Sequence, residues 1–316
     1  MRFFKLICFI SCLYSQTFAQ VKQTYYDFFW KPCDPVNARF FSTVEKTDSG
    51  WLRNDYFTYE KKLQMQALYK DEACKINNGR MFYYHANGNP SLVGTMINGQ
   101  RQGVCISFHH NGMMADSATY LYNRPIGSRN LWHPNGFLSD SIYHLNDSID
   151  VHIQWFDDGK PSAAGYRKWG KPEGKWNYFH HNGGKAGEII YDEGRIVSCK
   201  YTNEDGSELK DTATANSPAE FKKRGLQGWQ EYLDKSLYWP TDYQLSEAAT
   251  ITVGVEFTVD ENGKIIDPHV YLPFHPAFDR IALLVVKNSP AWKPTVHHNR
   301  KIKATRRQPI SFSQPE

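Results

Sequence analysis

Phe108-His109-His110-Asn111-Gly112 and Phe179-His180-His181-Asn182-Gly183 are two copies of one pattern, in which an aromatic residue stands four positions before a glycine. The closing glycines of successive copies lie 24, 24, 23, 24 and 23 residues apart. They are Gly88, Gly112, Gly136, Gly159, Gly183 and, in a degenerate last copy, Gly206. A fixed period of this length indicates a repeat architecture. The central part of the chain is therefore predicted to be a stack of similar units.

Each unit is expected to be a β-hairpin. Asn-Gly and Asp-Gly favour a type I′ turn, because both central residues of that turn need positive φ. The aromatic residues before the turn favour a strand, and the alternating residues 91–96 are typical of a return strand. A single hairpin is marginal in water, so neighbouring units must stack to bury their aromatic side chains. The predicted fold class is mainly β, with a repeated hairpin array.

The repeats resemble a known family at their best-matching copy. Gly174-Lys175-Trp176-Asn177-Tyr178-Phe179 is similar to the MORN-variant repeats of YwqK-like antitoxin-type proteins, although the equivalent residues 103–108 lack the tryptophan. Residues 48–57 resemble the segment that leads into such arrays in exported bacterial proteins. The resemblance covers about residues 25–206 and implies a general interaction surface. It also implies, as an alternative, an antitoxin or immunity role in which the repeats would mask a toxin.

Two rows of equivalent side chains run through the repeats. His85, His109, His133 and His180 share one position. Equivalent residues of stacked two-strand units lie about 9–10 Å apart, whereas metal ligands lie near ~2 Å from their ion, so the row predicts no metal site. The other row could form a carbohydrate or peptide groove, but such a row is more often the core of an array. It consists of Tyr84, Phe108, Trp132, Trp155 and Phe179.

The first residues predict export. A basic start, an apolar run over residues 6–14 and Thr17-Phe18-Ala19 form a secretory signal pattern, with a mature chain beginning at Gln20. Lipoprotein processing at Cys12 is the weaker alternative, because Lys5 would leave a very short apolar region. The expected location is the periplasm or the cell envelope of a Gram-negative-type bacterium, and peripheral attachment to a membrane stays open.

The pairing of the cysteines of the mature chain in disulfides also stays open. These cysteines are Cys33, Cys74, Cys105 and Cys199.

A second domain follows a change in composition. Residues 211–219 are small and polar and are typical of a linker. Apolar residues from Phe221 to Leu237 recur at helical spacing, and Pro240 ends that helix. Residues 251–259 and 264–272 predict two strands, Pro276 begins a second helix, and residues 301–312 predict a last strand. The predicted order of segments is signal peptide (1–19), leading segment and start of the array (20–75), repeats (76–210), linker (211–219) and C-terminal domain (220–316).

The C-terminal stretch resembles the TonB C-terminal domain, a ββαβ fold with a preceding helix. The matching motifs are Trp239-Pro240, Val255-Glu256-Phe257-Thr258-Val259-Asp260, Ser289-Pro290-Ala291-Trp292-Lys293-Pro294 and Pro309-Ile310-Ser311-Phe312. The chain departs from the family with His298-Asn299-Arg300, where members usually carry Asn-Gly. Family members also have an N-terminal anchor and a long Pro-rich spacer, where this chain shows a cleavable signal and a short linker. The resemblance implies capture of an extended partner segment at a free sheet edge.

That edge is predicted to bind a protein or peptide of the cell envelope. The last thirty residues hold seven Lys or Arg against one acid, which suits an acidic peptide or an anionic envelope surface. Charge on an edge strand also protects against aggregation, and this alternative stays open. The candidate partner-binding residues are Ile302, Lys303, Ala304, Thr305, Arg306 and Arg307.

The sequence predicts no enzyme, cofactor or metal. It contains no phosphate-binding loop, nucleophile elbow, zinc-protease helix or dinucleotide fingerprint, and no small-molecule substrate is evident. Its net charge of only +4 argues against nucleic acid. The leading hypothesis is an envelope binding or scaffold protein. A TonB-like energy transducer or accessory acting on an outer-membrane receptor is the first alternative, and an antitoxin-type protein is the second.

Overall fold

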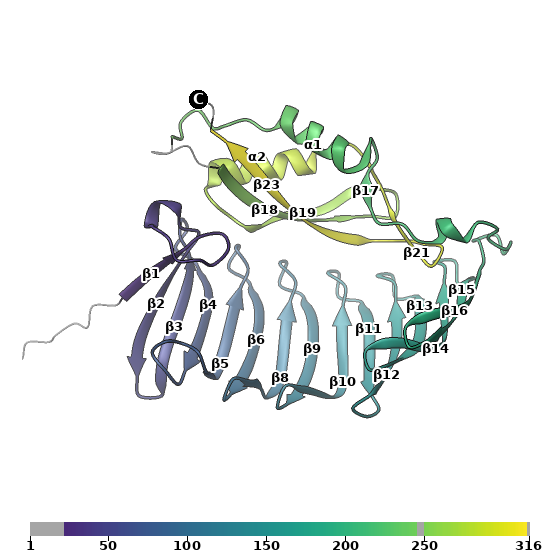
Figure 1. Ribbon diagram of the computed structural model, residues 1–316. Coiled ribbons are helices and arrows are strands. Elements are labelled where there is room, and N and C mark those ends of the chain that lie inside the picture. The colour runs from purple at the N-terminus through teal and green to yellow at the C-terminus, as the bar shows by residue number, and fades with distance from the viewer. Residues whose placement is uncertain (1–21, 245–249, 315–316) are drawn as a thin grey trace, which may run out of the picture.

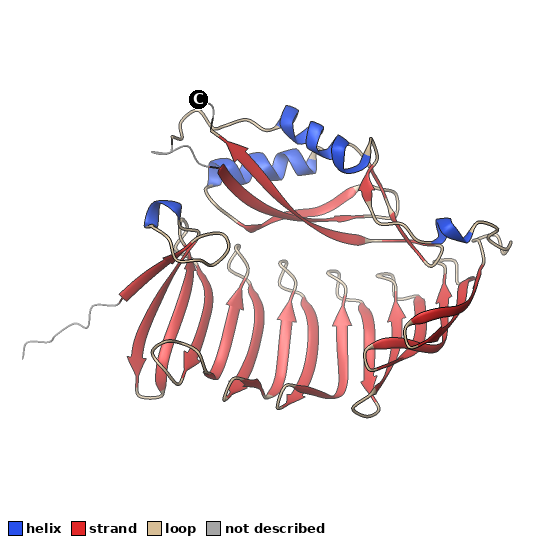
Figure 2. Cartoon of the chain, in the orientation of Figure 1, coloured by secondary structure: helices blue, strands red, loops and turns tan. Residues whose placement is uncertain are grey.

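The structure is a computed structural model and describes residues 22–244 and 250–314. The signal peptide and the Gln20 start predicted above lie outside these residues. The described chain forms one long antiparallel sheet and a small α+β domain that lies along one edge of it (Figures 1 and 2). The expectation of a mainly β chain with a C-terminal α+β domain is therefore confirmed. No helix among the described residues is long and apolar enough to cross a membrane.

The long sheet is a meander that starts at β1 (Lys22–Tyr26) and ends at β16 (Arg195–Tyr201). Its strands pair in chain order, except that the short β7 (Gln100–Arg101) pairs only with β6. This order is compatible with the predicted hairpin repeats, and the leading segment adds its strands to the same sheet. The remaining strands are β2 (Phe40–Thr47), β3 (Gly50–Phe57), β4 (Leu63–Tyr69), β5 (Asn77–Tyr84), β6 (Pro90–Ile97), β8 (Gly103–Phe108), β9 (Met114–Leu121), β10 (Arg124–Trp132), β11 (Leu138–His144), β12 (Ile149–Trp155), β13 (Pro161–Lys168), β14 (Lys171–Phe179) and β15 (Lys185–Asp192), with the short helix η1 (Pro35–Asn37) after β1.

The turns that contain the repeat glycines, called the repeat turns below, differ from the predicted type I′. Gly88 has φ of +92°, but Asn87 is not among the residues with positive φ. The Gly88 N–H donates to His85 O (2.8 Å), and the register shifts between Tyr83 and Tyr84. These features define a type I turn followed by a left-handed glycine in a G1 bulge. The type I′ prediction was wrong because Asn87 acts through its side chain, which accepts from Asn89 N (3.0 Å) and donates to His110 O (2.7 Å).

The turns at the opposite edge of the sheet do have the type I′ conformation. Asn98 and Gly99 have φ of +53° and +78°, and Trp169 and Gly170 have φ of +54° and +76°. Both central residues are thus left-handed, as that turn requires. The two edges of the array therefore use different turns, and only the repeat turns carry the histidine row.

One face of the array is buried by small and sulfur-containing side chains. Met81 lies opposite Gly94 in the β5–β6 pair, and Cys105 lies opposite Ala118 in the β8–β9 pair. A Cβ added at Gly94 would stand 2.7 Å from Cys105 Sγ, so only glycine leaves room for the neighbouring sulfur. Towards β16 this face becomes aromatic, with Trp176 and Tyr178 buried. The four described cysteines are free thiols.

The C-terminal domain has the predicted order of a helix followed by ββαβ. Helix α1 (Gly225–Ser236) precedes β18 (Thr250–Val259) and β19 (Ile265–Leu272), and α2 (Pro276–Lys287) precedes the last strands. The single strand predicted over residues 301–312 is instead two, because β22 (Arg300–Ile302) pairs with β21 (Thr295–His297) whereas β23 (Ala304–Ser313) pairs with β18. The short strands β17 (Glu220–Phe221) and β20 (Trp292–Lys293) pair with each other, and η2 (Thr212–Ala215) lies within the stretch predicted as a linker.

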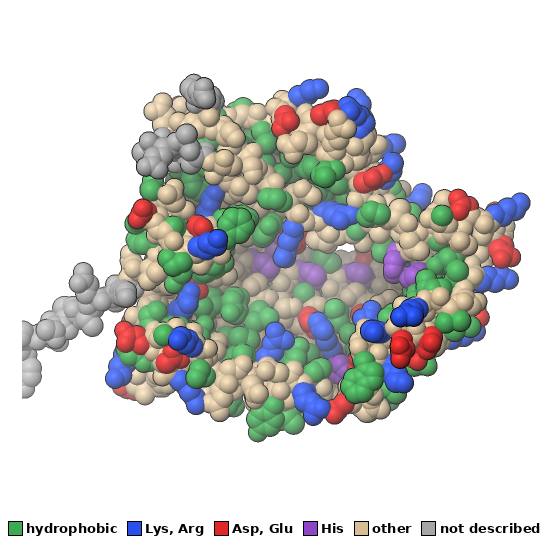
Figure 3. Space-filling model, viewed as in Figure 1, with side chains coloured by type: hydrophobic (Ala, Val, Ile, Leu, Met, Phe, Trp, Pro, Cys, Tyr) green, Lys and Arg blue, Asp and Glu red, His purple; other side chains and the backbone are tan. Residues whose placement is uncertain are grey.

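The three-stranded sheet β19-β18-β23 has one apolar and one polar face. Val253, Val255 and Phe257 are fully buried in the core that contains α2. The alternating residues Thr252 and Glu256 point to the other face, as strand geometry requires. This polar face lies towards the repeat turns, and Figure 3 shows a hollow between the two domains with histidine side chains along it.

Candidate functional site

The histidine row binds one repeat to the next. His85 Nε2 lies 2.9 Å from Phe108 O, His109 Nε2 lies 2.8 Å from Trp132 O, and the equivalent bonds follow in the later repeats. A backbone carbonyl only accepts, so each of these nitrogens must carry the hydrogen. The remaining members are His133 to Trp155 O (3.0 Å) and His180 to Thr202 O (2.8 Å). The row is thus a ladder of hydrogen bonds between repeats, which the sequence did not predict.

The aromatic row lies directly before these turns and is half-buried. Its backbone carbonyls at Phe108, Trp132 and Trp155 are the acceptors of the histidine ladder. In the fourth repeat Phe156 replaces the histidine, and its ring stacks on His181 with centroids 3.7 Å apart. A binding groove along this row stays a prediction. The five side chains are Tyr84, Phe108, Trp132, Trp155 and Phe179.

The candidate partner-binding residues lie on β22, on β23 and at the break between them. Lys303, at the break, pairs with Asp157 of a repeat turn. Arg306 Nη2 donates to Ala219 O (2.6 Å), and Arg307 Nε lies 2.5 Å from Glu256 Oε2. All three cations therefore have partners within the chain. Ile302 and Ala304 are half-buried, and Thr305 is exposed.

A free strand edge and an apolar cavity meet beside β23. This strand is the last in the order β19-β18-β23, so no further strand pairs with it among the described residues. A cavity of about 140 Å³ adjoins Arg306 and Gln308 and is lined by Trp229 and Trp292. Leu226, which helical spacing assigned to the apolar face of α1, is 82% exposed at this cavity instead. The structure thus places an exposed leucine next to an unpaired edge.

A second cavity, of about 740 Å³, separates the N-terminal segment from the polar face of the C-terminal sheet. Arg39 lines this cavity. Its Nη2 donates to Thr252 O (2.9 Å), and its guanidinium lies 4.0 Å from the Phe274 ring centroid. Burial lowers the pKa of Arg39 to about 10. Its Nη1 is buried and has no hydrogen-bond partner among the residues that the structure describes. A sheet face forms this lining, so the cavity suits a side chain or small group better than an added strand.

The tip of the β21–β22 hairpin anchors the two domains to each other. His298 is 7% exposed, and its ring lies 4.0 Å from the ring of Tyr178 near the end of the array. Asn299 Nδ2 donates to Thr202 O (2.9 Å). Arg300 Nη1 donates to both Ser162 O (2.6 Å) and Ser162 Oγ (2.8 Å). The residues at which the sequence departs from the TonB pattern are therefore the ones that enter the array.

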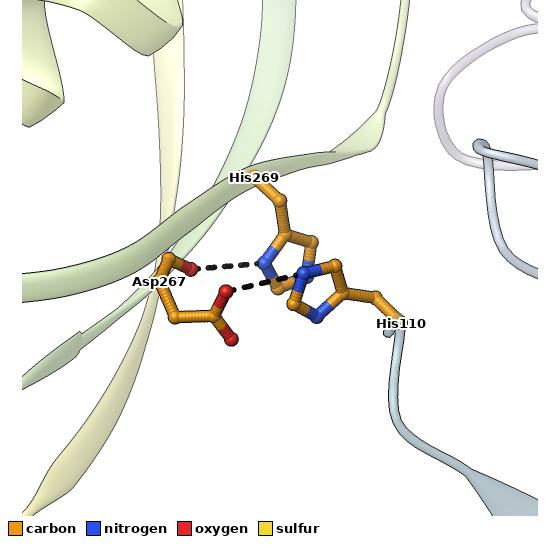
Figure 4. A group of neighbouring side chains, drawn as sticks. All are labelled: His110, Asp267 and His269. Carbon is orange, nitrogen blue, oxygen red and sulfur yellow. Dashed lines mark hydrogen bonds and ion pairs between the residues drawn. The ribbon is translucent and has the colours of Figure 1, made fainter. Parts of the chain in front are cut away.

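Three side chains that could hold a metal ion lie together between the two domains, and the sequence did not group them. Figure 4 shows His110 of a repeat turn facing Asp267 and His269 of β19. One ligand atom from each of the three lies within 4.8 Å of the others. His110 and Asp267 are separated by 157 residues and belong to different domains. No spacing signal links such distant positions, so this cluster emerges only when the domains are assembled.

Comparison with known proteins identifies the C-terminal sheet. Residues 247–313 match the family model described as Gram-negative bacterial TonB protein C-terminal. The C-terminal domain is therefore TonB-like, as its motifs predicted, and the match favours a protein of the Gram-negative cell envelope with a protein partner. No curated protein matches the chain. The resemblance of the repeats to the MORN-variant family stays a prediction.

Proposed function

We propose that this chain is an exported binding and scaffold protein of the cell envelope, whose TonB-like domain captures an extended segment of a partner protein along β23. The observation that carries the proposal is the unpaired edge of β23 next to an apolar cavity. Extended peptides add to such edges through main-chain hydrogen bonds, and neighbouring pockets select their side chains. The array would hold this domain in place and present a second surface.

The pairing of β23 indicates which of its backbone groups face outwards. Pro309 has no N–H to donate to β18. Its backbone nitrogen and carbonyl are therefore expected to lie on the side of β23 that faces away from β18, where no hydrogen bond to that strand is lost. The next outward-facing position agrees: Ser311 lies opposite Thr252 of β18, and Thr252 gives its carbonyl to Arg39 rather than to β23. The register is continuous over Ala304–Ser313. By alternation, Thr305 and Arg307 direct their backbone N–H and C=O groups to the open edge.

The side chains around this edge suit a partner segment that carries an apolar side chain next to a polar group. Leu226 offers exposed apolar surface, and the buried Trp229 lines the cavity next to it. Arg306 borders the cavity, and its Nε is buried without a hydrogen-bond partner in the described part of the chain. A partner carbonyl or carboxylate placed here would satisfy that nitrogen. Because the neighbouring cations are already paired, main-chain bonding and apolar contact would supply more of the affinity than long-range charge.

Thr305→Pro is expected to reduce partner capture at least about ten-fold, because it removes an outward N–H that an added strand needs. Thr305→Ala is the matched control, since it loses the same side chain and keeps the N–H. A photo-crosslinking residue at position 226 should form adducts with a specific envelope protein in the native host, and one at the exposed Trp169 should not. Equal adduct yields in the proline and alanine variants would rule out strand addition at this edge.

Energy transduction to an outer-membrane receptor is the second candidate, and the TonB-like match favours it. The two candidate functions differ in whether the chain is anchored in the inner membrane. A mature start at Gln20 in the periplasmic fraction is the expected result for the binding protein. An intact N-terminus in the inner membrane would move transduction to first place. N-terminal sequencing of the fractionated protein from its host distinguishes them.

A further inference from the structure

His110, Asp267 and His269, called the interdomain cluster below, bring three metal-ligating groups from two domains together. His110 Nε2 lies 3.2 Å from Asp267 Oδ1, and the two imidazole rings are nearly parallel with centroids 3.6 Å apart (Figure 4). Asp267 has φ of +52°, and the β18–β19 register shifts between Glu256 and Thr258. This irregularity in the strand pairing turns the Asp267 carboxylate towards the repeat turn. Such bulges commonly re-aim functional side chains.

The hydrogen bonds of His269 fix which of its nitrogens is free. Nδ1 lies 3.1 Å from the backbone oxygen of Asp267, and a carbonyl only accepts, so Nδ1 carries the hydrogen. In the neutral ring, Nε2 therefore presents a lone pair. That lone pair faces Glu256 Oε1 at 3.5 Å, so two electron-rich atoms stand opposite each other without a hydrogen between them. A cation at Nε2, either a proton or a metal ion, would resolve this conflict.

The surroundings of His269 already suit a metal ligand. A metal-ligating histidine typically donates its other ring N–H to a carbonyl or carboxylate, and His269 already has that arrangement. The Glu256 carboxylate is itself held by Arg307 and can orient the site.

The geometry points to a binding site for a divalent transition-metal ion of the zinc class, formed by Nε2 of His110, Nε2 of His269 and the carboxylate of Asp267. Two imidazoles and one carboxylate are ligands that zinc, cobalt and nickel accept. Ligands about 2.0–2.2 Å from a tetrahedral ion lie roughly 3.2–3.5 Å apart, and the three ligand atoms here lie within 4.8 Å of one another. The two stacked rings must tilt out of their parallel arrangement so that both Nε2 lone pairs face one ion. Asp267 is 47% exposed in its side chain, which leaves an entry path. The bound ion would link the array to the C-terminal domain.

The test is a titration of the full-length mature chain with Co²⁺ and Zn²⁺, followed by Co²⁺ absorption and calorimetry. One equivalent is expected to bind, with the intense visible bands of a tetrahedral cobalt site. His110→Gln, His269→Gln and Asp267→Asn should each weaken the affinity at least about ten-fold. The matched control is His181→Gln, because His181 occupies the same repeat position and faces the carboxylates of Asp158 and Glu261 without a second imidazole.

A second readout separates metal binding from simple packing of the rings. Zn²⁺ should raise the melting temperature of the wild type and of the His181 variant by more than that of the three cluster variants. Absence of saturable binding, or equal affinity in wild-type and cluster variants, would overturn the proposal and leave the stacked rings as an interdomain contact only. Circular dichroism of each variant checks that it is folded. The cluster shares no residue with the β23 edge, so this result and the peptide-capture result are independent.

Discussion

Replacing Arg300 by alanine is expected to weaken the docking of the C-terminal domain on the array by about 2–4 kcal/mol. Arg300 is 5% exposed, and its hydrogen-bond partners among the described residues are His297 O, Ser162 O and Ser162 Oγ, none of them a carboxylate. Its guanidinium also lies 4.9 Å from the Tyr178 ring centroid. Each hydrogen bond from a charged group contributes about 1.5–3 kcal/mol, and a buried cation–π contact contributes up to ~2 kcal/mol. Part of that gain offsets the desolvation that lowers the pKa of Arg300 to about 10.

Hydrogen exchange measured by mass spectrometry is the appropriate readout, because a two-domain chain does not define one unfolding free energy. The Arg300→Ala variant should exchange faster in β21, β22 and the end of the array, while β18 stays protected. Lys301→Ala is the matched control, since Lys301 is the next residue on the hairpin and is exposed. Unchanged exchange at the interface would mean that the other tip contacts hold the domains by themselves.

In the array, the sequence predicts where the turns lie but not which type of turn forms. The repeat glycines marked the turns correctly, because a left-handed backbone position is a local requirement that glycine meets without strain. The turn type was wrong, because Asn87 was assigned a backbone role when it acts through hydrogen bonds to Asn89 and to His110 of the next repeat. That second bond crosses 23 residues, so it follows from stacking and not from any local pattern.

At the candidate sites too, local patterns predict the elements, whereas the contacts between distant elements appear only in the folded structure. Propensity and periodicity predict a last strand near β23, whereas its free edge was implied only by the resemblance to the TonB C-terminal domain. The cavity beside it depends on where α1 lies, and the exposure of Leu226 contradicts its place in the helical pattern. His298 and Arg300 were visible only as departures from a family motif. Their role became clear once Tyr178 and Ser162 were found opposite them.

Acid is expected to loosen the domain interface, because His298 is held neutral there. Burial, followed by the charges of His297 and Arg300, lowers its pKa from 6.5 to about 3. The folded state therefore binds the proton less tightly than the unfolded state does. The stability that depends on neutral His298 is complete above pH ~6.5 and is lost as the pH falls from there towards 3. At pH 5 the loss should be about 1–2 kcal/mol, from 1.36 kcal/mol per pKa unit.

His298→Asn tests this titration without disturbing the turn. His298 has φ of +52°, and asparagine tolerates that conformation better than most residues. The variant should dock more weakly at pH 7.5, because it loses contact with Tyr178 and the hydroxyls of Tyr191 and Tyr201, which lie 3.5 Å from the ring nitrogens. Its interface exchange should then change much less between pH 7 and pH 5 than that of the wild type, after correction for intrinsic exchange rates.

His297 would leave a residual slope, because burial lowers its pKa as well. The double variant with His297→Asn separates the two contributions. The hydroxyls of Tyr191 and Tyr201 can each donate or accept, so a neutral His298 ring is satisfied in either tautomer. A protonated ring would require both hydroxyls to accept while Arg300 stands nearby, and this is why the interface selects the neutral form. If the wild type and both variants share one pH slope, the acid sensitivity must originate elsewhere, with the interdomain cluster at His110 as the next position to substitute.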